Sequence, residues 1–360
     1  MDRFKIFLKI TSVVLTACLV VISAFGVGIE ALFGKAALLS FMVAAPDGVH
    51  SIYNKSIDVA PENTQDAQGT VTDRFVEVPN TNTEGTVSES TTVAVEQKVM
   101  GNIIKKTLSP YSANTHYDCV YVKNTSGAKV DIASDLESKL DFELNKSQEP
   151  EILIYHTHTT EGFMNSESEY YTDHDEPRTT DTEKNIAKIG EVIAERLRKA
   201  GYSVVHDKTL HDHPGFSGSY NRSADTVKTI LEKYPTIKIA IDVHRDSILS
   251  GKSDRIAPVV SVNGKEAAQV MLVMGSETGS IENYPDWRQN FKFATKLQYT
   301  FESTYPQFAR AMLLRSAKYN QNLTKGSILI EVGSDANTME QALYSAELVG
   351  RSLATLLNSQ

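Results

Sequence analysis

From residue 149 to the C-terminus, short apolar runs alternate with longer stretches in which the apolar residues have helical spacing. The run 151–155 is apolar and β-rich, whereas 182–200 carries isoleucines and leucine at spacings of three and four. Further strands are predicted at 202–206, 237–243, 259–262, 270–275 and 327–332, and further helices at 223–234, 291–305 and 338–357. Strands that alternate with helices predict an α/β fold, with a mostly parallel, twisted sheet of about six strands and helices on both faces.

The N-terminus has the pattern of a membrane anchor. Arg3, Lys5 and Lys9 precede an uncharged apolar run at 10–29, and about 20 apolar residues are enough to span a bilayer. The positive-inside rule then places residues 1–9 in the cytoplasm and everything after the run outside. A cleaved signal peptide is the alternative, although its small-residue site at Ala44-Ala45 lies well beyond the apolar run. We favour a single uncleaved transmembrane helix.

The segments after this anchor differ in composition. A juxtamembrane segment is expected at 30–60, and residues 61–97 are rich in Thr, Glu, Asn, Val and Gly. Such a stretch buries too little apolar surface to offset its chain entropy, so it predicts a flexible linker. Residues 98–148 are interpreted as an N-terminal extension of the folded domain, with a short strand at 119–123. The catalytic domain is predicted over 149–360.

Composition excludes several classes of function. The chain has 360 residues, a formal net charge of −9 and a pI near 5.5, whereas phosphate binding needs a basic surface, so no nucleic-acid partner is expected. Of two cysteines, Cys18 lies in the apolar N-terminal run, which leaves Cys119 with neither a disulfide partner nor a CxxC zinc motif. The Walker A, GxSxG and HExxH motifs are absent from the sequence.

Imidazole and carboxyl groups follow three of the predicted strands. The strand at 151–155 leads into His156 and His158, the strand at 237–243 into His244, and the strand at 327–332 contains Glu331. The carboxyl ends of parallel strands meet at one edge of a sheet, where ligands bind. These side chains are therefore expected to lie close together, although each histidine taken alone also fits a buried group with purely local hydrogen bonds.

Two histidines and a carboxylate suit a catalytic zinc, which takes three protein ligands and leaves one position open for water. Glu183 is the candidate for the third ligand because it opens the predicted helix at 182–200; a capping role is the alternative. Glu331 lies in a very apolar strand, where desolvation raises the pKa of a carboxyl group into the range of a general base. Pairing with Arg245 or Arg255 is its alternative.

Other polar positions are weaker candidates. His206, His211 and His213 fall in a turn-rich stretch that we interpret as a solvated loop. Arg222 leads into a predicted helix and Arg245 follows His244, so either arginine is a candidate for a substrate carboxylate or for orienting an imidazole. Trp287 fits both a substrate platform and a packed anchor, and the sequence does not decide between them.

The segments ILIYHTHTTE, IDVHRDS and ILIEVGSDANT resemble the stage II sporulation protein P family, as do VYVKNTSG and PDWRQN. The resemblance covers roughly residue 117 to the C-terminus. It implies a catalytic domain similar to amidase-3 type N-acetylmuramoyl-L-alanine amidases, with one Zn²⁺ per chain. Carried over residue by residue, it implies zinc ligands at His158, Glu183 and His244 and a catalytic Glu331.

This sequence departs from the amidase pattern in two places. It has YHTH where the amidases have Asp-Pro-Gly-His, so His156 competes with His158 for the ligand position. Side chains two apart on a strand share a face, so both are expected to reach the site, with His156 as helper or substrate contact. A longer insertion before Glu183 also weakens the assignment of that residue.

The resemblance further implies a role in endospore formation. The implied activity is hydrolysis of septal peptidoglycan during engulfment, by an amidase with an additional endopeptidase activity. The implied partners are the lytic transglycosylase stage II sporulation protein D and other engulfment membrane proteins, at the sporulation septum. The alternatives are a non-catalytic wall-binding scaffold and a zinc carboxypeptidase or deacetylase on the same substrate.

Overall fold

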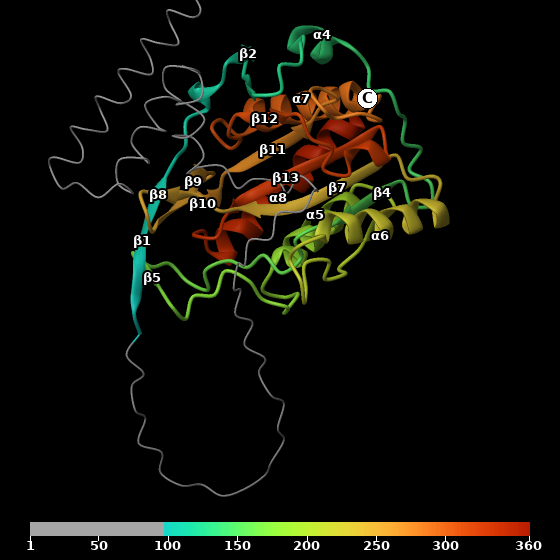
Figure 1. Cartoon of the computed structure of the whole chain (residues 1–360). Helices are drawn as coiled ribbons and strands as arrows, with labels where there is room; N and C mark the ends of the chain where they lie inside the picture. Colours follow the sequence, from blue (N-terminus) through green and yellow to red (C-terminus); the bar gives the residue numbers. More distant parts are fainter. Residues whose placement is uncertain (1–96) are drawn as a thin grey trace, which may run out of the picture. The chain divides into compact units, whose positions relative to one another are not determined.

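The computed structural model describes residues 97–360, which form a mixed α/β domain (Figure 1). Its main sheet has eight strands in the order β2-β3-β12-β11-β13-β7-β4-β6. Their bounds are β2 Thr115–Tyr117, β3 Val120–Asn124, β4 Ile152–Tyr155, β6 Val204–His206, β7 Ile239–Asp246, β11 Val270–Gly275, β12 Met312–Arg315 and β13 Gly326–Ser334. The predicted α/β class is confirmed.

The strand directions correct the prediction of a mostly parallel sheet of about six strands. The neighbours β13, β7, β4 and β6 run parallel to one another, but β11 pairs antiparallel with β13, and β2 pairs antiparallel with β3. The β11 strand reverses because β10 and β11 follow β9 through short turns, without the crossover helix that a parallel neighbour requires.

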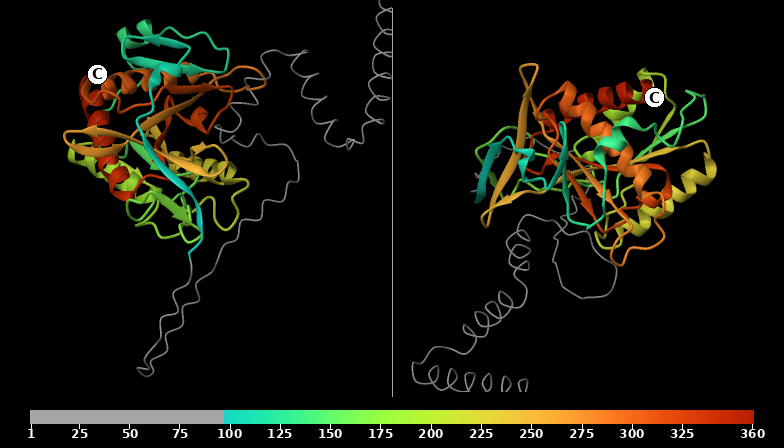
Figure 2. Two further views of the ribbon diagram at one scale, coloured as in Figure 1. Left: turned by 90° about the vertical axis from the view of Figure 1, so that its left-hand side faces the viewer. Right: turned by 90° about the horizontal axis from the view of Figure 1, so that it is seen from above.

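A second sheet was not predicted. It has five strands in the order β10-β9-β1-β5, with β8 also paired to β9. Their bounds are β1 Val99–Lys106, β5 Tyr170–Thr172, β8 Leu249–Ser250, β9 Asp254–Val262 and β10 Lys265–Ala268. Figure 2 shows β1 as a long strand along one side of the domain. Most residues of β1 are exposed, so its sequence lacks the apolar run that predicted strands such as β4 and β7.

Helices cover both faces of the main sheet, as predicted. The long helices are α5 Ile186–Lys199, α6 Ser219–Lys233, α7 Trp287–Thr304 and α8 Met339–Asn358; the short ones are α4 Ile132–Glu137, η1 Pro110–Ser112 and η2 Gln321–Leu323. Residues of α5, α7 and α8 join Ile154, Ile241 and Ile330 in the largest hydrophobic core. On the opposite face, Val227 of α6 packs with Tyr155 and Ala240.

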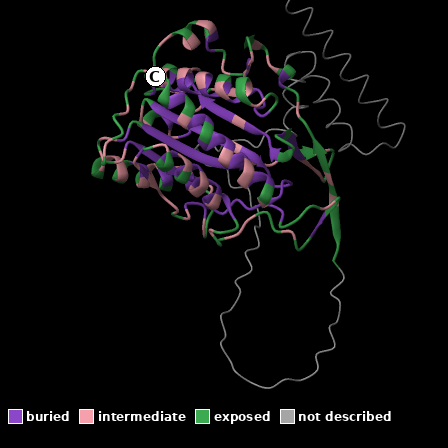
Figure 3. Cartoon of the chain, turned by 180° about the vertical axis from the view of Figure 1, so that it is seen from behind, coloured by how far each residue is buried: buried purple, intermediate pink, exposed green. Residues whose placement is uncertain are grey.

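We call the two faces of the main sheet the α5 side and the α6 side, after the helices that pack on them. Successive residues of a strand point to opposite faces, so the packing of a few residues assigns every position of the strand to one side. The central strands are buried at every position except Asp246 and Glu331, which are half-buried, and Figure 3 shows these strands as mostly buried. Polar groups on these strands are therefore desolvated. The predicted cytoplasmic, transmembrane and juxtamembrane segments, and the linker up to residue 96, lie outside the described residues. Within 97–360, none of the helices has the length and apolar character needed to cross a membrane.

Candidate metal centre

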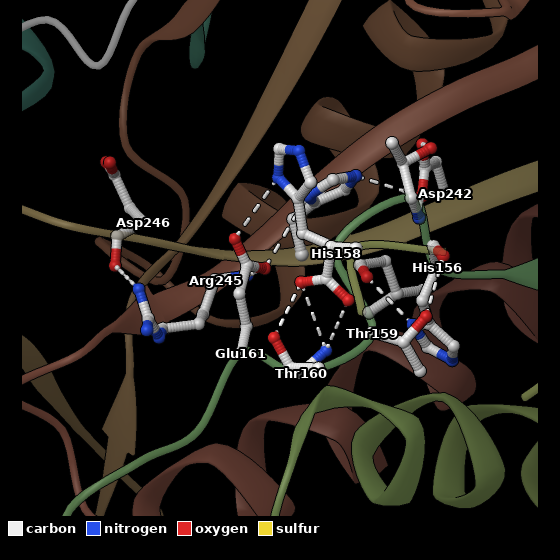
Figure 4. A network of polar contacts seen from close by, with 12 residues as sticks. His156, His158, Thr159, Thr160, Glu161, Asp242, Arg245 and Asp246 are labelled. Atoms are coloured by element: carbon white, nitrogen blue, oxygen red, sulfur yellow. Dashed lines mark hydrogen bonds and ion pairs between the residues drawn. The ribbon is translucent and has the colours of Figure 1, made fainter. Parts of the chain in front are cut away.

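Three side chains from two strand ends meet on the α6 side of the sheet. His158 follows β4, His244 lies within β7, and Glu161 comes from the turn after His158; their potential ligand atoms all lie within 4.8 Å of one another. The Glu161 carboxylate lies between the imidazoles, with Oε1 3.4 Å from Nδ1 of His158 and Oε2 3.5 Å from Nδ1 of His244. Figure 4 shows this carboxylate beside His158.

The chain turns sharply after β4, and this turn separates the two neighbouring histidines. Residues 157–160 form turns, and the Thr157 amide and hydroxyl both donate to Asp242, at 2.8 and 2.6 Å. His158 therefore reaches the α6 side, while His156 points to the α5 side, where it meets Gly190 and His206. The expectation that His156 and His158 share a face is wrong, because β4 ends at Tyr155.

Asp242 completes the surroundings of His244. It lies two residues earlier on β7, on the same face, and its Oδ1 is 2.9 Å from Nε2 of His244. This contact does not have hydrogen-bond geometry, so the carboxylate acts on the ring through its charge, and Nδ1 of His244 faces Glu161. Asp242 was missed in the sequence, where it reads as one polar residue inside an apolar strand.

Electrostatics mark this cluster as a site for a cation. Burial lowers the pKa of His244, but Asp242 and Glu161 outweigh that effect and hold it well above its ordinary value. Burial raises the pKa of Glu161, yet its contacts with His158 and His244 hold it well below its ordinary value. Two buried carboxylates flanking an imidazole therefore provide a negative environment that favours positive charge.

The donor set and its spacing fit zinc. Two histidines and one glutamate are a known ligand set for catalytic zinc, and tetrahedral bonds of about 2.0–2.1 Å place ligand atoms about 3.3 Å apart. The two measured separations from Glu161 are 3.4 and 3.5 Å, which is long for a hydrogen bond but close to that edge length. His158, Glu161 and His244 are thus the residues that would hold the ion.

Glu331 lies directly across the sheet from His244. The two are register partners in the parallel β13–β7 pair, so their side chains stand next to each other on the α6 side. Burial and then Asp246 raise the pKa of Glu331 to about 8, partly offset by His244. Its Oε2 is buried without a hydrogen-bond partner among the described residues. Neither Arg245 nor Arg255 forms the ion pair that was the alternative for this residue.

Glu183 lies apart from this cluster. The α5 helix begins at Ile186 with Asn185 as its cap, so the expectation that Glu183 opens the helix is wrong. The Glu183 side chain is 61% exposed, and its carboxylate pairs with Lys188 at 2.7 Å. The geometry instead brings Glu161 to the two histidines. A His-x-x-Glu spacing within one turn was the signal in the sequence, because the Glu161 amide donates to the His158 carbonyl.

The two candidate arginines hold loops. Arg245 is buried; its amide donates to Glu161 Oε2 at 3.0 Å, and its guanidinium donates to the carbonyls of Gly162 and Pro177. Arg222 donates to the carbonyls of His211, Gly215 and Ser217. Arg245 therefore fixes the segment that carries Glu161, and both guanidinium groups are occupied by main-chain acceptors.

The remaining candidates are packed in the structure. Trp287 is buried at the start of α7. Its ring meets Phe291 edge to face, and the Arg288 guanidinium lies over the ring. His211 is also buried, with Nδ1 2.7 Å from the His156 carbonyl and Nε2 2.9 Å from the Thr226 hydroxyl, so the solvated-loop interpretation does not hold for it.

Sequence comparison shows the family of this chain. The family model described as stage II sporulation protein P matches residues 49–354. The curated stage II sporulation protein P of Bacillus subtilis (strain 168) is 28% identical over 206 residues, which cover 54% of this chain and 48% of that protein. The chain thus matches about half the length of this curated relative.

Solved structures with some likeness to this chain include two amidases. The CwlD amidase of Clostridioides difficile, solved in complex with the GerS lipoprotein, has 12% identity, a TM-score of 0.37, and coverage of 58% of this chain and 100% of that one. An N-acetylmuramoyl-L-alanine amidase of Nostoc punctiforme has 14% identity, a TM-score of 0.34, and coverage of 59% and 98%. Both TM-scores are below 0.5, so neither likeness by itself assigns a substrate to this chain.

Proposed function

This chain belongs to the stage II sporulation protein P family, and we propose on that premise that it is a zinc-dependent peptidoglycan hydrolase of endospore formation. The observation that carries the proposal is the placement of Glu331 opposite His244, beside the cluster of His158, Glu161 and His244. Three ligand groups with a separate buried carboxyl group at their side match the needs of a hydrolytic zinc site.

The residues of the site have separate roles in the proposed hydrolysis. His158, Glu161 and His244 would hold Zn²⁺, which when bound polarises a carbonyl and lowers the pKa of water. The Asp242 carboxylate, 2.9 Å from Nε2 of His244, stabilises positive charge at that ring. Glu331 accepts a proton at Oε2 from the attacking water and passes it to the leaving amine nitrogen. Burial and then Asp246 raise its pKa to about 8, which suits a group that accepts a proton and returns it in the same reaction.

We propose the lactyl-amide bond between muramic acid and L-alanine as the principal substrate bond, with peptide cross-links as a second one. The apolar run at 10–29 and the basic residues before it support a single-pass membrane protein with an extracytoplasmic domain at the sporulation septum. Stage II sporulation protein D and other engulfment membrane proteins are the proposed partners, on family grounds.

The test is digestion of purified sacculi by the full-length chain, followed by mass spectrometry of the products. We expect glycan strands freed of peptide together with intact stem peptides. Chelator should abolish the release, and added zinc should restore it. Glu331→Gln should lower the rate by roughly 10²–10⁴-fold, the usual contribution of a general base, while the variant retains one zinc per chain.

The products separate the rival functions. Shortened stem peptides identify a carboxypeptidase, and free acetate identifies a deacetylase. Wall binding without release of any product, in the presence of zinc, identifies a scaffold. Full release by Glu331→Gln contradicts the assigned role of that carboxyl group.

A further inference from the structure

A polar cavity lies beside the metal centre. It has a volume of about 260 Å³. Gly162, next to Glu161 in the chain, forms part of its wall, as do Arg178 and Lys184. Arg255 and Asp335 also line it. Asp335 directly follows β13, so the cavity opens at the same sheet edge as the metal centre.

Arg255 and Asp335 form an incompletely satisfied ion pair in this cavity. Their closest contact joins Arg255 Nε to Asp335 Oδ2 at 3.3 Å, and that oxygen also accepts from the Ser247 hydroxyl. Among the described residues, Arg255 Nη1 and Asp335 Oδ1 are both buried without a hydrogen-bond partner. Asp335 is only 5% exposed, so its free oxygen is withdrawn from bulk water.

The surroundings fix both groups in place. The Arg255 guanidinium lies 3.7 Å from the ring centroid of Tyr171, and the Asp335 amide donates to the Asp246 carbonyl at the end of β7. The other arginine of the wall is occupied, because Arg178 pairs with Asp212 at 2.6 Å. One pre-organised donor and one pre-organised acceptor of opposite charge therefore remain side by side. Buried charged groups with unused hydrogen-bonding capacity are costly unless a ligand completes them.

We propose that this cavity is a subsite for a zwitterionic α-amino-acid group of the substrate peptide. The carboxylate of such a group matches Arg255 and its ammonium matches Asp335. This inference rests on the proposed function, in which the substrate is a peptidoglycan stem. A stem residue with a free amino-acid end, namely a diaminodicarboxylic acid, carries both charges on one carbon.

The reach of a stem peptide suits the placement. Asp335 lies four positions after Glu331, so at about 3.3 Å per residue the two positions are at most about 13 Å apart in the direction of β13. An extended peptide covers that span with about four residues at 3.3–3.6 Å each. A residue near the third position from the cut bond is thus in range of the cavity.

Three peptides test the recognition by calorimetry with the full-length chain, without any need for turnover. L-Ala-γ-D-Glu-meso-diaminopimelate carries both charges. Its L-lysine counterpart lacks only the distal carboxylate, and its 2-aminopimelate counterpart lacks only the distal ammonium. We expect the first to bind roughly tenfold or more tightly than either of the others, the size of one charge-assisted hydrogen bond.

Two variants should remove these preferences separately. Arg255→Gln is expected to abolish discrimination against the lysine peptide, and Asp335→Asn to abolish discrimination against the 2-aminopimelate peptide. Arg196→Gln is the matched control, because Arg196 pairs with Glu347 at 2.8 Å on helices α5 and α8 and lines no part of this cavity. It should keep both preferences. Thermal unfolding of each variant shows whether it still folds. If one of the two variants does not fold, the other still tests its own preference.

Equal affinity of the wild type for all three peptides overturns the subsite, as does a full preference retained in both cavity variants. If the chain digests sacculi yet shows no preference, the subsite alone fails and the proposed function stands. If it binds none of the peptides and releases nothing from sacculi with zinc present, the proposed function fails and the subsite fails with it.

Discussion

His156 and His158 leave the end of the same strand, and each meets a second histidine, but they do so on opposite faces of the sheet. On the α6 side, His158 and His244 share the carboxylate of Glu161, and Asp242 stands behind His244. On the α5 side, His156 and His206 bring their Nε2 atoms within 2.9 Å of each other with no carboxylate in hydrogen-bond contact among the described residues.

The α5-side pair is neutral. Nδ1 of His156 lies 2.8 Å from the Val243 carbonyl, which only accepts, so that nitrogen carries the proton and Nε2 accepts one from His206. Burial lowers the pKa of His156 to about 4, and burial together with His156 lowers that of His206 to about 2. The comparison teaches that carboxylates, rather than the number of imidazoles, make one pair a cation site and leave the other a structural contact.

The largest expected effect comes from removing the shared carboxylate. Glu161→Gln leaves a neutral amide between His158 and His244, so we expect zinc affinity to fall by more than the roughly 10–100-fold that outer partners of a metal ligand contribute. Hydrolysis should be lost at substoichiometric zinc. Metal analysis after dialysis against a competing chelator measures the change. Glu183→Gln is the matched control, because Glu183 only pairs with Lys188 at the surface, and it should bind zinc like the wild type.

The α5-side pair predicts a loss of stability in acid. Between its ordinary pKa of 6.5 and the folded value of about 4, His156 takes up a proton only in the unfolded chain. The stability contributed by His156 is therefore complete above 6.5 and is lost as the pH drops toward 4, by about 3 kcal/mol at 1.36 kcal/mol per pKa unit. Urea unfolding in chelator at several pH values measures this slope. His206→Gln, which removes one such proton, should flatten it; an unchanged slope contradicts the assignment.

Crowding on the α5 side gives a smaller effect. A Cβ built at Gly190 would lie 2.5 Å from Cε1 of His156 and 2.8 Å from Nε2 of His206. We therefore expect Gly190→Ala to destabilise the fold by about 1–3 kcal/mol, the usual cost of overpacking, as measured by urea unfolding. Zinc affinity should stay nearly unchanged, because the clash lies on the opposite face from the metal centre. A loss of zinc without loss of stability would show that the two faces are coupled.

Asp242→Asn tests the carboxylate that contacts His244 without being one of the three proposed metal ligands. It keeps the shape of the side chain but removes the charge beside Nε2 of His244, so zinc affinity should fall by roughly 10–100-fold. Competition with a fluorescent chelator measures this change. An affinity equal to that of the wild type would mean that Glu161 alone accounts for the difference between the two pairs.

The sequence predicted the parts of the site that lie on regular structure. His244 and Glu331 occupy strands whose apolar runs mark them clearly, and parallel pairing of β7 and β13 then brings them together. Glu161 was missed because it lies in a turn, where no periodicity reports direction, and because the helix was expected to begin before Glu183. The separation of His156 and His158 was missed for the same reason: His156 still follows the alternation of β4, but the turn at 157–160 carries His158 to the opposite face.

The unpredicted strands share one physical cause. β1 pairs with β5 and β9, which lie far along the chain, and its exposed positions give no hydrophobic pattern. β12 is short and half-buried, so its four residues resemble a loop. Long-range pairing supplies the stability of such strands, and that information is not local to their sequence.

The residues of the metal centre are held in place in two different ways, and Arg245 provides one of them. His244 and Glu331 are held by the ladder between β7 and β13, so their amide hydrogens should exchange with solvent only through global opening. Glu161 is held to β7 by Arg245, whose guanidinium fastens the loop through the carbonyls of Gly162 and Pro177. Main-chain hydrogen bonds from Glu161 to His158 and Ile186 hold the same segment, and it can open without any change in the sheet. We therefore expect the residence time of a bound ion to follow opening of this loop rather than the unfolding rate of the domain.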